Sequence, residues 1–350
     1  MRKIIAAAAV VFSAVVAASS CSSTQPNQAA DPSADGPPYP EFLSAEDKEA
    51  IAYRDTLRPL DPCGYLDDAA VRRIGTPIYM GAETILSWCT VRFASPSAVP
   101  GVGSISVAMM RSGLGDATHQ VGDVEVWTIP SSEPGRFCRA GVPVDGRRDI
   151  VLGVYADPDS EAGGSTGDLC ATALDLATAT VPHRSERPLR ASSQRAHMNS
   201  RLATLDPCAV LGTVGKGHHP TLRAHEVDPY VDPWKCEFLL DSGDVTTAQT
   251  IRYMFELDAT HMKAKGTRKE TTIGGLRATE DPTPGDPWPA GTCEIKLSTA
   301  PQPPVFEPGT PTGPADAGYS EIISIRTHNG CTTARTTAEE LARLYHQLPH

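Results

Sequence analysis

The sequence predicts an α+β fold that is built twice: two tandem similar domains, each an antiparallel sheet of about five strands with an N-terminal and a C-terminal helix and two disulfides. Three observations predict this fold. A four-cysteine pattern occurs twice, each copy opens with Leu-Asp-Pro-Cys, and each has a tryptophan just before its second cysteine. The two sets are Cys63, Cys89, Cys138 and Cys170, then Cys208, Cys236, Cys293 and Cys331.

The N-terminus has the three parts of an export signal. Arg2 and Lys3 precede an apolar stretch, residues 4–18, and two small residues stand before Cys21. The stretch is shorter than the roughly 20 apolar residues of a membrane-spanning helix. We therefore expect residues 1–20 to be a cleaved signal peptide.

The chain has nine cysteines, and an odd number in an exported protein needs an explanation. If eight pair within the two repeats, Cys21 is left over, where bacterial lipoproteins carry their lipidated cysteine. We expect Cys21 to be acylated, for example with palmitate, and residues 21–45 to form a flexible tether. Ala18 occupies the position that usually holds Leu in the lipoprotein signal, so ordinary signal peptidase cleavage near Ser19 or Ser20 is the alternative.

The rest of the chain divides into a first domain (46–183), a basic linker (184–203) and a second domain (204–350). Five arginines lie in the linker, which has few apolar residues: Arg184, Arg187, Arg190, Arg195 and Arg201. They could form a contact strip for acidic polymers or lipid headgroups. We favour a solvated connector.

Each domain is predicted to open with a helix. Asp61-Pro62 and Asp206-Pro207 each place a side-chain acceptor at the N-cap and a proline at the first helical position. The first helix runs to Ile74, whereas Gly212 and Gly215 cut the second one short. The next strand holds the second cysteine, because apolar residues alternate with polar ones over 89–93 and 236–240.

The later elements also repeat. Strands over 105–109 and 251–257 follow, then glycine turns at Gly122 and at Gly274-Gly275 lead into a third strand. The third cysteine lies in a fourth strand, and fifth strands lie near 150–155 and 322–325. The fourth cysteine opens the final helix, for which Thr337 and Glu340 form a capping box in the second domain.

Four cysteines allow three pairings per domain. We favour consecutive pairing, because it joins both helices to one sheet and keeps every loop within one domain. In the chain-entropy model, each disulfide that closes a loop of this size stabilises its domain by about 3 to 4 kcal/mol. A zinc site is disfavoured, since the spacings lack close Cys-x-x-Cys pairs.

These residues resemble a family of actinobacterial lipoproteins whose domain has no known function. The pattern is a lipidated cysteine, a tether, Asp-Pro-Cys, a Trp and Cys pair, a glycine turn, a later Cys, and a Cys before a final Ala-rich helix ending in Val-Pro or Leu-Pro. It occurs here from Asp61 to Pro182 and again from Asp206 to Pro349. The resemblance implies a cell-envelope lipoprotein and no established activity, and two copies depart from the usual single domain.

One local group of residues has the chemistry of a metal site. It comprises His218, His219 and His225 with Asp228 and Asp232, and imidazole and carboxylate suit zinc or copper. The segment is rich in Pro and Gly, so we favour a solvated loop. We expect no metal and no cofactor.

Other candidates have ordinary structural explanations. Asp241 to Asp244 are expected to form a hairpin turn rather than a nucleophile site. Trp88 and Trp234 are expected to pack in the core against a disulfide. Six prolines between Ser298 and Gly318 suggest a stiff exposed loop, although a polyproline ligand for a partner is the alternative.

The net charge and the absence of catalytic motifs limit the functions that the sequence allows. The net charge is −11, and removing the first 20 residues takes away Arg2 and Lys3, which gives −13. Such a chain should repel nucleic acid. Standard catalytic motifs are missing from the sequence, so we expect a non-enzymatic binding or accessory module at the outer face of the cytoplasmic membrane. Its partner would be an envelope protein or a small ligand. The alternative is an envelope hydrolase with a site built from distant residues.

Overall fold

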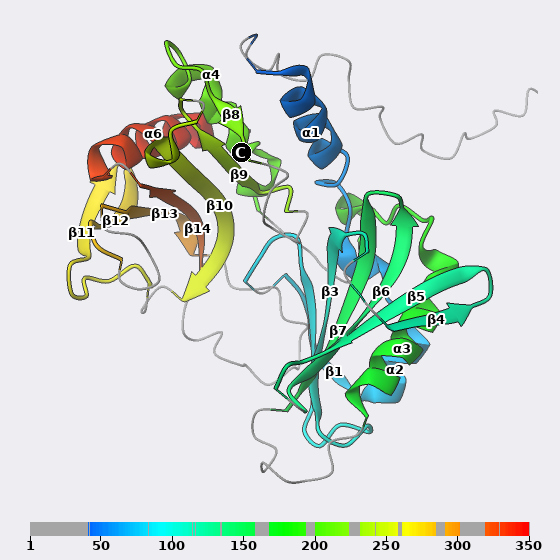
Figure 1. Ribbon diagram of the computed structural model, residues 1–350. Coiled ribbons are helices and arrows are strands. Elements are labelled where there is room, and N and C mark those ends of the chain that lie inside the picture. The colour runs from blue at the N-terminus through cyan, green and yellow to red at the C-terminus, as the bar shows by residue number, and fades with distance from the viewer. Residues whose placement is uncertain are drawn as a thin grey trace, which may run out of the picture. The chain divides into compact units, whose positions relative to one another are not determined.

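A computed structural model describes residues 41, 43–82, 84–113, 115, 117–133, 135–157, 168–193, 200–223, 232–241, 243–257, 261–284, 291–301, 319–328 and 330–349. Two antiparallel sheets of seven strands each dominate it (Figure 1). The predicted α+β class and the layout of two similar domains are therefore confirmed. The strand count is seven per sheet rather than about five.

The first sheet has the strand order β1-β2-β3-β7-β6-β5-β4. Its strands are β1 (Pro77–Gly81), β2 (Cys89–Phe93), β3 (Val102–Arg111), β4 (Ala117–Val121), β5 (Val124–Pro130), β6 (Phe137–Asp145) and β7 (Arg148–Ala156). The helices of this half are α1 (Ala45–Asp55), η1 (Pro62–Tyr65), α2 (Asp68–Ile74), α3 (Leu169–Thr180) and the short η2 (Val181–His183) and η3 (Arg190–Ser192). The elements α1, β1 and β4 were not predicted from the sequence.

The second sheet has the order β11-β12-β13-β14-β10-β9-β8. Its strands are β8 (Thr221–Leu222), β9 (Lys235–Leu239), β10 (Ala248–Leu257), β11 (Lys269–Ile273), β12 (Leu276–Asp281), β13 (Cys293–Pro301) and β14 (Tyr319–Thr327). The helices are η4 (Leu202–Thr204), η5 (Pro207–Val210), α4 (Leu211–Val214), η6 (Val245–Thr247) and α6 (Gly330–His346).

The opening helix of each half is smaller than predicted. Asp61 and Asp206 do cap as expected, each accepting the amide of the following cysteine at 2.9 Å, but they start 3-10 turns. In the first half the turn ends and Asp67 caps a separate helix, α2, through the amide of Ala70. In the second half α4 ends at Gly215, so the predicted shortening is confirmed.

The closing helices begin at the fourth cysteine, as predicted: Cys170 and Cys331 are each the second residue of α3 and α6. The predicted capping box in α6 is wrong. Thr337 lies seven residues inside the helix, is buried, and donates to Gln249 Oε1 at 2.7 Å. The helix begins at Gly330 instead, where the Cys293–Cys331 disulfide joins its first turn to β13.

All four disulfides join consecutive cysteines, which confirms the predicted pairing. The glycine turns are also confirmed. Gly122 connects β4 to β5 with φ 62°, and Gly274 and Gly275 connect β11 to β12 with φ 56° and 82°. Positive φ values of this kind favour glycine over any residue with a Cβ.

Each sheet packs one face on its closing helix, α3 on β5–β7 and α6 on β13 and β14. Strand residues alternate as predicted, so that Cys89, Val91 and Phe93 are buried between half-buried neighbours. We call this the helix face of each sheet and the opposite side the outer face.

The helix α1 packs in the second core although it belongs to the first half of the chain. Leu43 and Ile51 join the cluster around Trp234 and Leu341, and so does Leu86 from the connection between β1 and β2. The same connection extends the second sheet, since Thr84 O accepts the amide of Phe255 at 2.9 Å and Ile85 pairs with Met254. Residues of the first half therefore complete the second core and pair with the part of β10 that β9 does not cover.

Where the structure describes the linker, four of its arginines are bonded to the folded domains, although residues 185–187, 191 and 192 are exposed. Its arginines donate to backbone carbonyls of the folded domains: Arg184 to Val181, Arg187 to Thr56, Arg190 to Leu86, and Arg201 to Leu348 and Pro349. Arg195 lies outside the described residues. These bonds explain why the segment carries so many guanidinium groups, each of which has several donors on a rigid plane.

Candidate functional site: a charged row on the outer face of the second sheet

The two repeats provide an internal comparison. Cys138 in β6 corresponds to Cys293 in β13, so Gly141 and Lys296, each three residues later, occupy equivalent positions. The pairing across the sheets extends the correspondence. The row Trp127, Gly141, Val151 and Ala108 in the first sheet matches the row Thr279, Lys296, Ser324 and Arg252 in the second.

In the first sheet this row is apolar. Trp127 lies over Gly141, where a Cβ would come within 2.0 Å of the indole ring. Met110, Trp127 and Val151 form a small buried cluster. The indole NH donates to Asp149 Oδ2 at 2.6 Å, which satisfies one oxygen of the buried carboxylate.

In the second sheet the same row carries a buried ammonium group. Lys296 Nζ lies 2.8 Å from both carboxylate oxygens of Glu256 and 3.7 Å from Glu294 Oε2. It is also 3.3 Å from Nδ1 of His261, which follows β10. The side chains of Lys296, Glu256 and Glu294 are only 5%, 10% and 7% exposed. The charges are therefore largely removed from water.

Further pairs continue the network along the outer face. Arg326 Nη2 lies 2.8 Å from Glu294 Oε1, to which the hydroxyl of Ser324 also donates at 3.3 Å. Arg252 Nε donates to Asp232 Oδ2 at 2.9 Å. We call Glu256, His261, Glu294, Lys296, Ser324 and Arg326 the charged row.

The electrostatics of the charged row favour a neutral imidazole. Burial lowers the pKa of His261, and the cations Lys296 and Arg268 lower it further, whereas Glu256 opposes them. Placing charges in a protein interior costs several kcal/mol per ion unless pairing offsets it. A set of this kind on one sheet, with no equivalent on its repeat, is a candidate functional site.

The chemistry of the row is that of fixed charges rather than of an activated nucleophile. The Ser324 hydroxyl donates to a carboxylate that two cations already neutralise, and Lys296 is held as an ammonium between acids. A nucleophile needs an adjacent free base. The row instead offers an ammonium, a guanidinium, carboxylates and an imidazole in fixed positions, with His261 36% and Arg326 33% exposed at its rim.

The structure separates the histidines and aspartates proposed for a metal. His218 Nδ1 lies 3.1 Å from Asp241 Oδ2, and His219 pairs through its backbone with Asp241. Asp232 instead binds Arg252 and the amide of Trp234. His225 and Asp228 lie outside the described residues. Within the described part of the chain, no group of three or more metal-ligating side chains is present.

The two tryptophans have different environments. Trp234 is 1% exposed in the second core, as predicted, and its indole NH donates to Ala203 O at 2.9 Å. Trp88 is only half-buried, so its predicted core position is wrong. The reason is register: Trp234 stands two residues before its cysteine and Trp88 one, which places them on opposite faces of an extended chain.

Several other predictions fall partly or wholly outside the described residues. Cys21 and the tether do so entirely. Of the proline-rich insertion, only Ser298–Pro301 are described, within β13. Asp241, Gly243 and Asp244 lie in the connection between β9 and β10 as predicted, with Gly243 at φ 83°.

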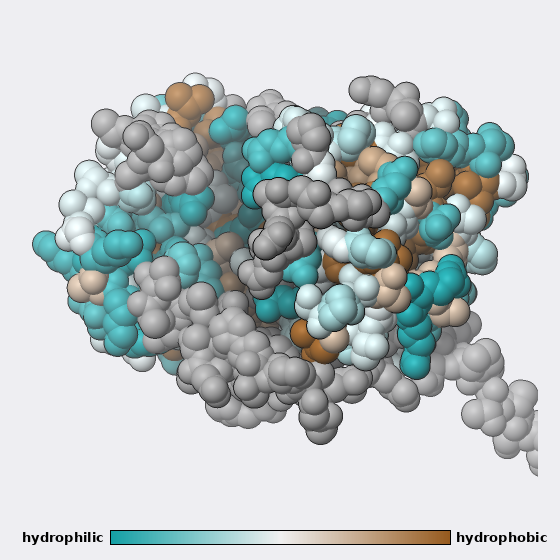
Figure 2. Space-filling view, turned by 90° about the horizontal axis from the view of Figure 1, so that it is seen from below, coloured by the Kyte–Doolittle hydropathy of each residue, from teal (hydrophilic) through white to brown (hydrophobic). Residues whose placement is uncertain are grey.

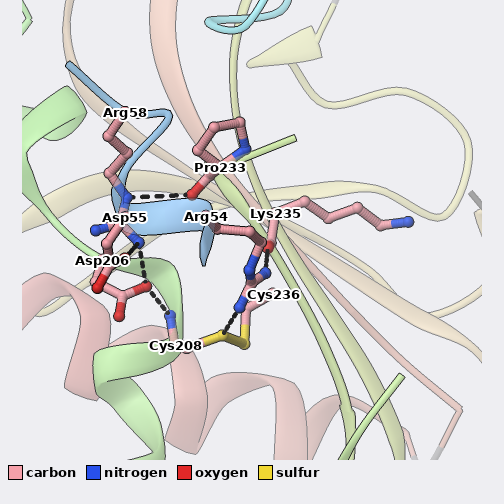
Figure 3. Close-up of a disulfide and its surroundings, with 8 residues drawn as sticks. All are labelled: Arg54, Asp55, Arg58, Asp206, Cys208, Pro233, Lys235 and Cys236. Atoms are coloured by element: carbon pink, nitrogen blue, oxygen red, sulfur yellow. Dashed lines mark hydrogen bonds and ion pairs between the residues drawn. A yellow bond between two sulfur atoms is a disulfide. The ribbon is translucent and has the colours of Figure 1, made fainter. Parts of the chain in front are cut away.

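A second polar group lies around the Cys208–Cys236 disulfide (Figure 3). Arg54 and Arg58, at the end of α1 and just after it, both reach this disulfide region. Arg58 Nη2 lies 2.8 Å from Asp206 Oδ1, and its Nε donates to Pro233 O at 3.2 Å. Nearby, Arg190 Cζ lies 4.7 Å from the centroid of the Trp234 ring. Burial lowers the pKa of Arg190 to about 10. Sequence analysis missed this junction because α1 was not predicted.

Strongly exposed large apolar side chains are rare among the described residues. Figure 2 shows a largely hydrophilic face with hydrophobic residues in separate groups. Among the described residues, Val245 is the one strongly exposed large apolar side chain, at 66%. None of the described helices is both long and apolar enough to cross a membrane. Comparison with models of protein families, with curated proteins and with solved structures gives no match. The resemblance to the lipoprotein family thus stays a prediction.

Proposed function

We propose that the protein is an exported lipoprotein that acts as a binding or accessory module at the outer face of the cytoplasmic membrane, with the charged row as its ligand-facing site. One observation carries the binding proposal: the two halves share their helix faces and disulfides but differ at equivalent outer-face positions, where Thr279 and the charged Lys296 replace Trp127 and Gly141. Buried charges cost stability, so their placement on one repeat favours a specific role.

The attachment to the membrane is supported by the cysteines. Eight of the nine are joined in four disulfides, which suits an oxidising compartment and leaves Cys21 over. Cys21→Ala should release the protein from membranes, because acyl chains at about 0.8 kcal/mol per buried CH₂ would supply the attachment. A variant that still fractionates with membranes after a high-salt wash would refute the anchor.

The ligand-facing site is tested by photo-crosslinking at two matched positions. Arg277 and Glu125 are exposed and occupy equivalent positions, two residues before Thr279 and Trp127. A photoreactive amino acid at 277 should capture a specific species from the native envelope, and the same amino acid at 125 should not. Equal capture from both positions, or none from 277, would contradict the proposal.

A hydrolase remains the second candidate, because the charged row gathers Glu256, His261 and Ser324 from distant parts of the sequence. A fluorophosphonate probe separates the two. Labelling of Ser324, located by mass spectrometry, would favour the hydrolase. We expect no label there, since the hydroxyl is bound to Glu294 and lacks an adjacent free base.

A further inference from the structure

The Cys208–Cys236 disulfide has a permanent cation against one of its sulfurs (Figure 3). Arg54 Nη2 lies 3.1 Å from Cys208 Sγ, and Nη1 donates to the carbonyl of Lys235. The site is buried, with Cys208 1%, Cys236 0% and Arg54 9% exposed. The guanidinium is therefore fixed beside the sulfur in a medium where water screens it little.

A cation at this distance changes the chemistry of the sulfur. It interacts weakly with the neutral disulfide but strongly with a thiolate, so it favours the reduced state in which Cys208 carries the charge. In thiol–disulfide exchange the sulfur with the lower thiol pKa is also the better leaving group. Both effects select Cys208 as the sulfur that leaves and Cys236 as the sulfur that is attacked.

We propose that Arg54 makes the Cys208–Cys236 disulfide reducible by a dithiol that reaches it when the surrounding structure opens locally, because the guanidinium stabilises Cys208 as a thiolate. A thiolate of the dithiol attacks Cys236 Sγ, the disulfide bond breaks, and its electron pair stays on Cys208 Sγ. The second thiol of the dithiol then attacks the mixed disulfide and releases Cys236, which takes up a proton. The protein gains two electrons, the dithiol becomes a disulfide, and the proton of its second thiol ends on Cys236.

The exchange couples the disulfide to α1. In the oxidised protein Arg54 contacts a neutral sulfur, whereas in the reduced protein it would pair with a thiolate. By linkage, if Arg54 on α1 stabilises the reduced state, reduction of the disulfide also strengthens the docking of α1. The disulfide thus reports on the docking of the helix that follows the N-terminal segment.

The test is an equilibrium measurement, because the buried position of the sulfurs affects rates. The full chain is equilibrated in buffers of reduced and oxidised dithiothreitol, and free thiols at each cysteine are quantified by differential alkylation and mass spectrometry. In Arg54→Met, half of the Cys208–Cys236 disulfide should open only when the ratio of reduced to oxidised dithiothreitol is about tenfold higher than for the wild-type protein. This change is the equivalent of one pKa unit at the thiolate. Arg54→Lys keeps the charge and should restore most of the effect.

Arg58→Met is the matched control. Arg58 binds Asp206 and Pro233 O, beside the same disulfide, and so its loss should shift the ratio less than about threefold. An unchanged ratio in Arg54→Met, or an equal shift in Arg58→Met, overturns the proposal.

The other three disulfides in each sample detect a general loss of structure. If all four half-opening ratios move in Arg54→Met, the pH dependence of Cys208 alkylation in Cys236→Ser decides. The midpoint of alkylation should be lower with Arg54 than with Met at position 54. Equal midpoints would overturn the proposal.

Discussion

The two halves of the molecule have the same helix face and different outer faces. On the helix face both have a disulfide from the opening turn to the second strand and another from the closing helix to a central strand. On the outer face Trp127 and Gly141 form a large-on-small pair, where the second half has Thr279 and Lys296. The comparison indicates that a stapled sheet tolerates opposite chemistry on its outer face when its buried charges are paired, as Lys296 is with Glu256.

The sharpest way to break this comparison is to remove the charge at its centre. Lys296→Met should destabilise the protein by about 3 to 5 kcal/mol, because it leaves Glu256 and Glu294 buried with one cation fewer. The free energy of unfolding in urea measures this. Lys269→Met, at an exposed position of β11, should change it by less than about 0.5 kcal/mol. Combining Lys296→Met with Glu256→Gln and Glu294→Gln should recover most of the loss, and failure to recover would mean that packing, not charge, explains the effect.

A second experiment asks whether the halves are complete on their own. Ile51→Ala on α1 should cost about 2 to 4 kcal/mol, since this fully buried side chain fills the second core. Hydrogen exchange should show that β9 and β10 lose protection before the strands of the first sheet do. Leu176→Ala on α3, in the first core, should show the reverse order. The same order for both variants would contradict the assignment of α1 to the second core.

The apolar row can be tested at its glycine. Gly141→Ala should destabilise the protein by about 1 to 3 kcal/mol, because the new methyl group would collide with the buried ring of Trp127. Gly146→Ala, where no atom lies within 4 Å of the added carbon, is the control. Thermal unfolding measures both, and equal melting temperatures would show that Trp127 moves aside freely.

The smallest expected effect concerns pH. The pKa of His261 is lowered in the folded state, so the folded protein binds fewer protons than the unfolded one near the ordinary value of 6.5. Its contribution to stability is present above that value and is lost as the pH falls through the folded pKa. Between about pH 7 and pH 5 the wild-type protein should therefore lose more stability than His261→Gln. Parallel pH profiles in urea unfolding would show that the imidazole has the same pKa in the folded and unfolded states.

Sequence reasoning reached the disulfides and the helix faces because both depend on local patterns. Alternation over 89–93 and 236–240 identifies the inward cysteines whatever the partner strands are. It missed the edge strands β4 and β11, whose sequences Ala-Thr-His-Gln-Val and Lys-Glu-Thr-Thr-Ile carry almost no buried stripe. It also missed α1, because that helix buries few apolar side chains and depends on contacts with distant residues.

The charged row could not be predicted from the sequence for a related reason. Glu294 and Lys296 alternate with buried Ile295 and Leu297, a pattern typical of a solvated outer face. That they are buried, and that Glu256 and His261 meet them, depends on the register of β10, β14 and β13. Register of this kind follows from the whole sheet rather than from any one strand.

The strand pairing of Thr84 and Ile85 with β10 has a consequence for how the chain folds as it is synthesised. A polypeptide made from its N-terminus presents α1 and residues 84–86 long before the strand that receives them. During that interval Ile51 and Leu86, both fully buried in the finished protein, have no second core to enter. Contacts so distant in sequence form slowly. The late synthesis of β10 therefore leaves these apolar side chains of the first half exposed until the second sheet forms.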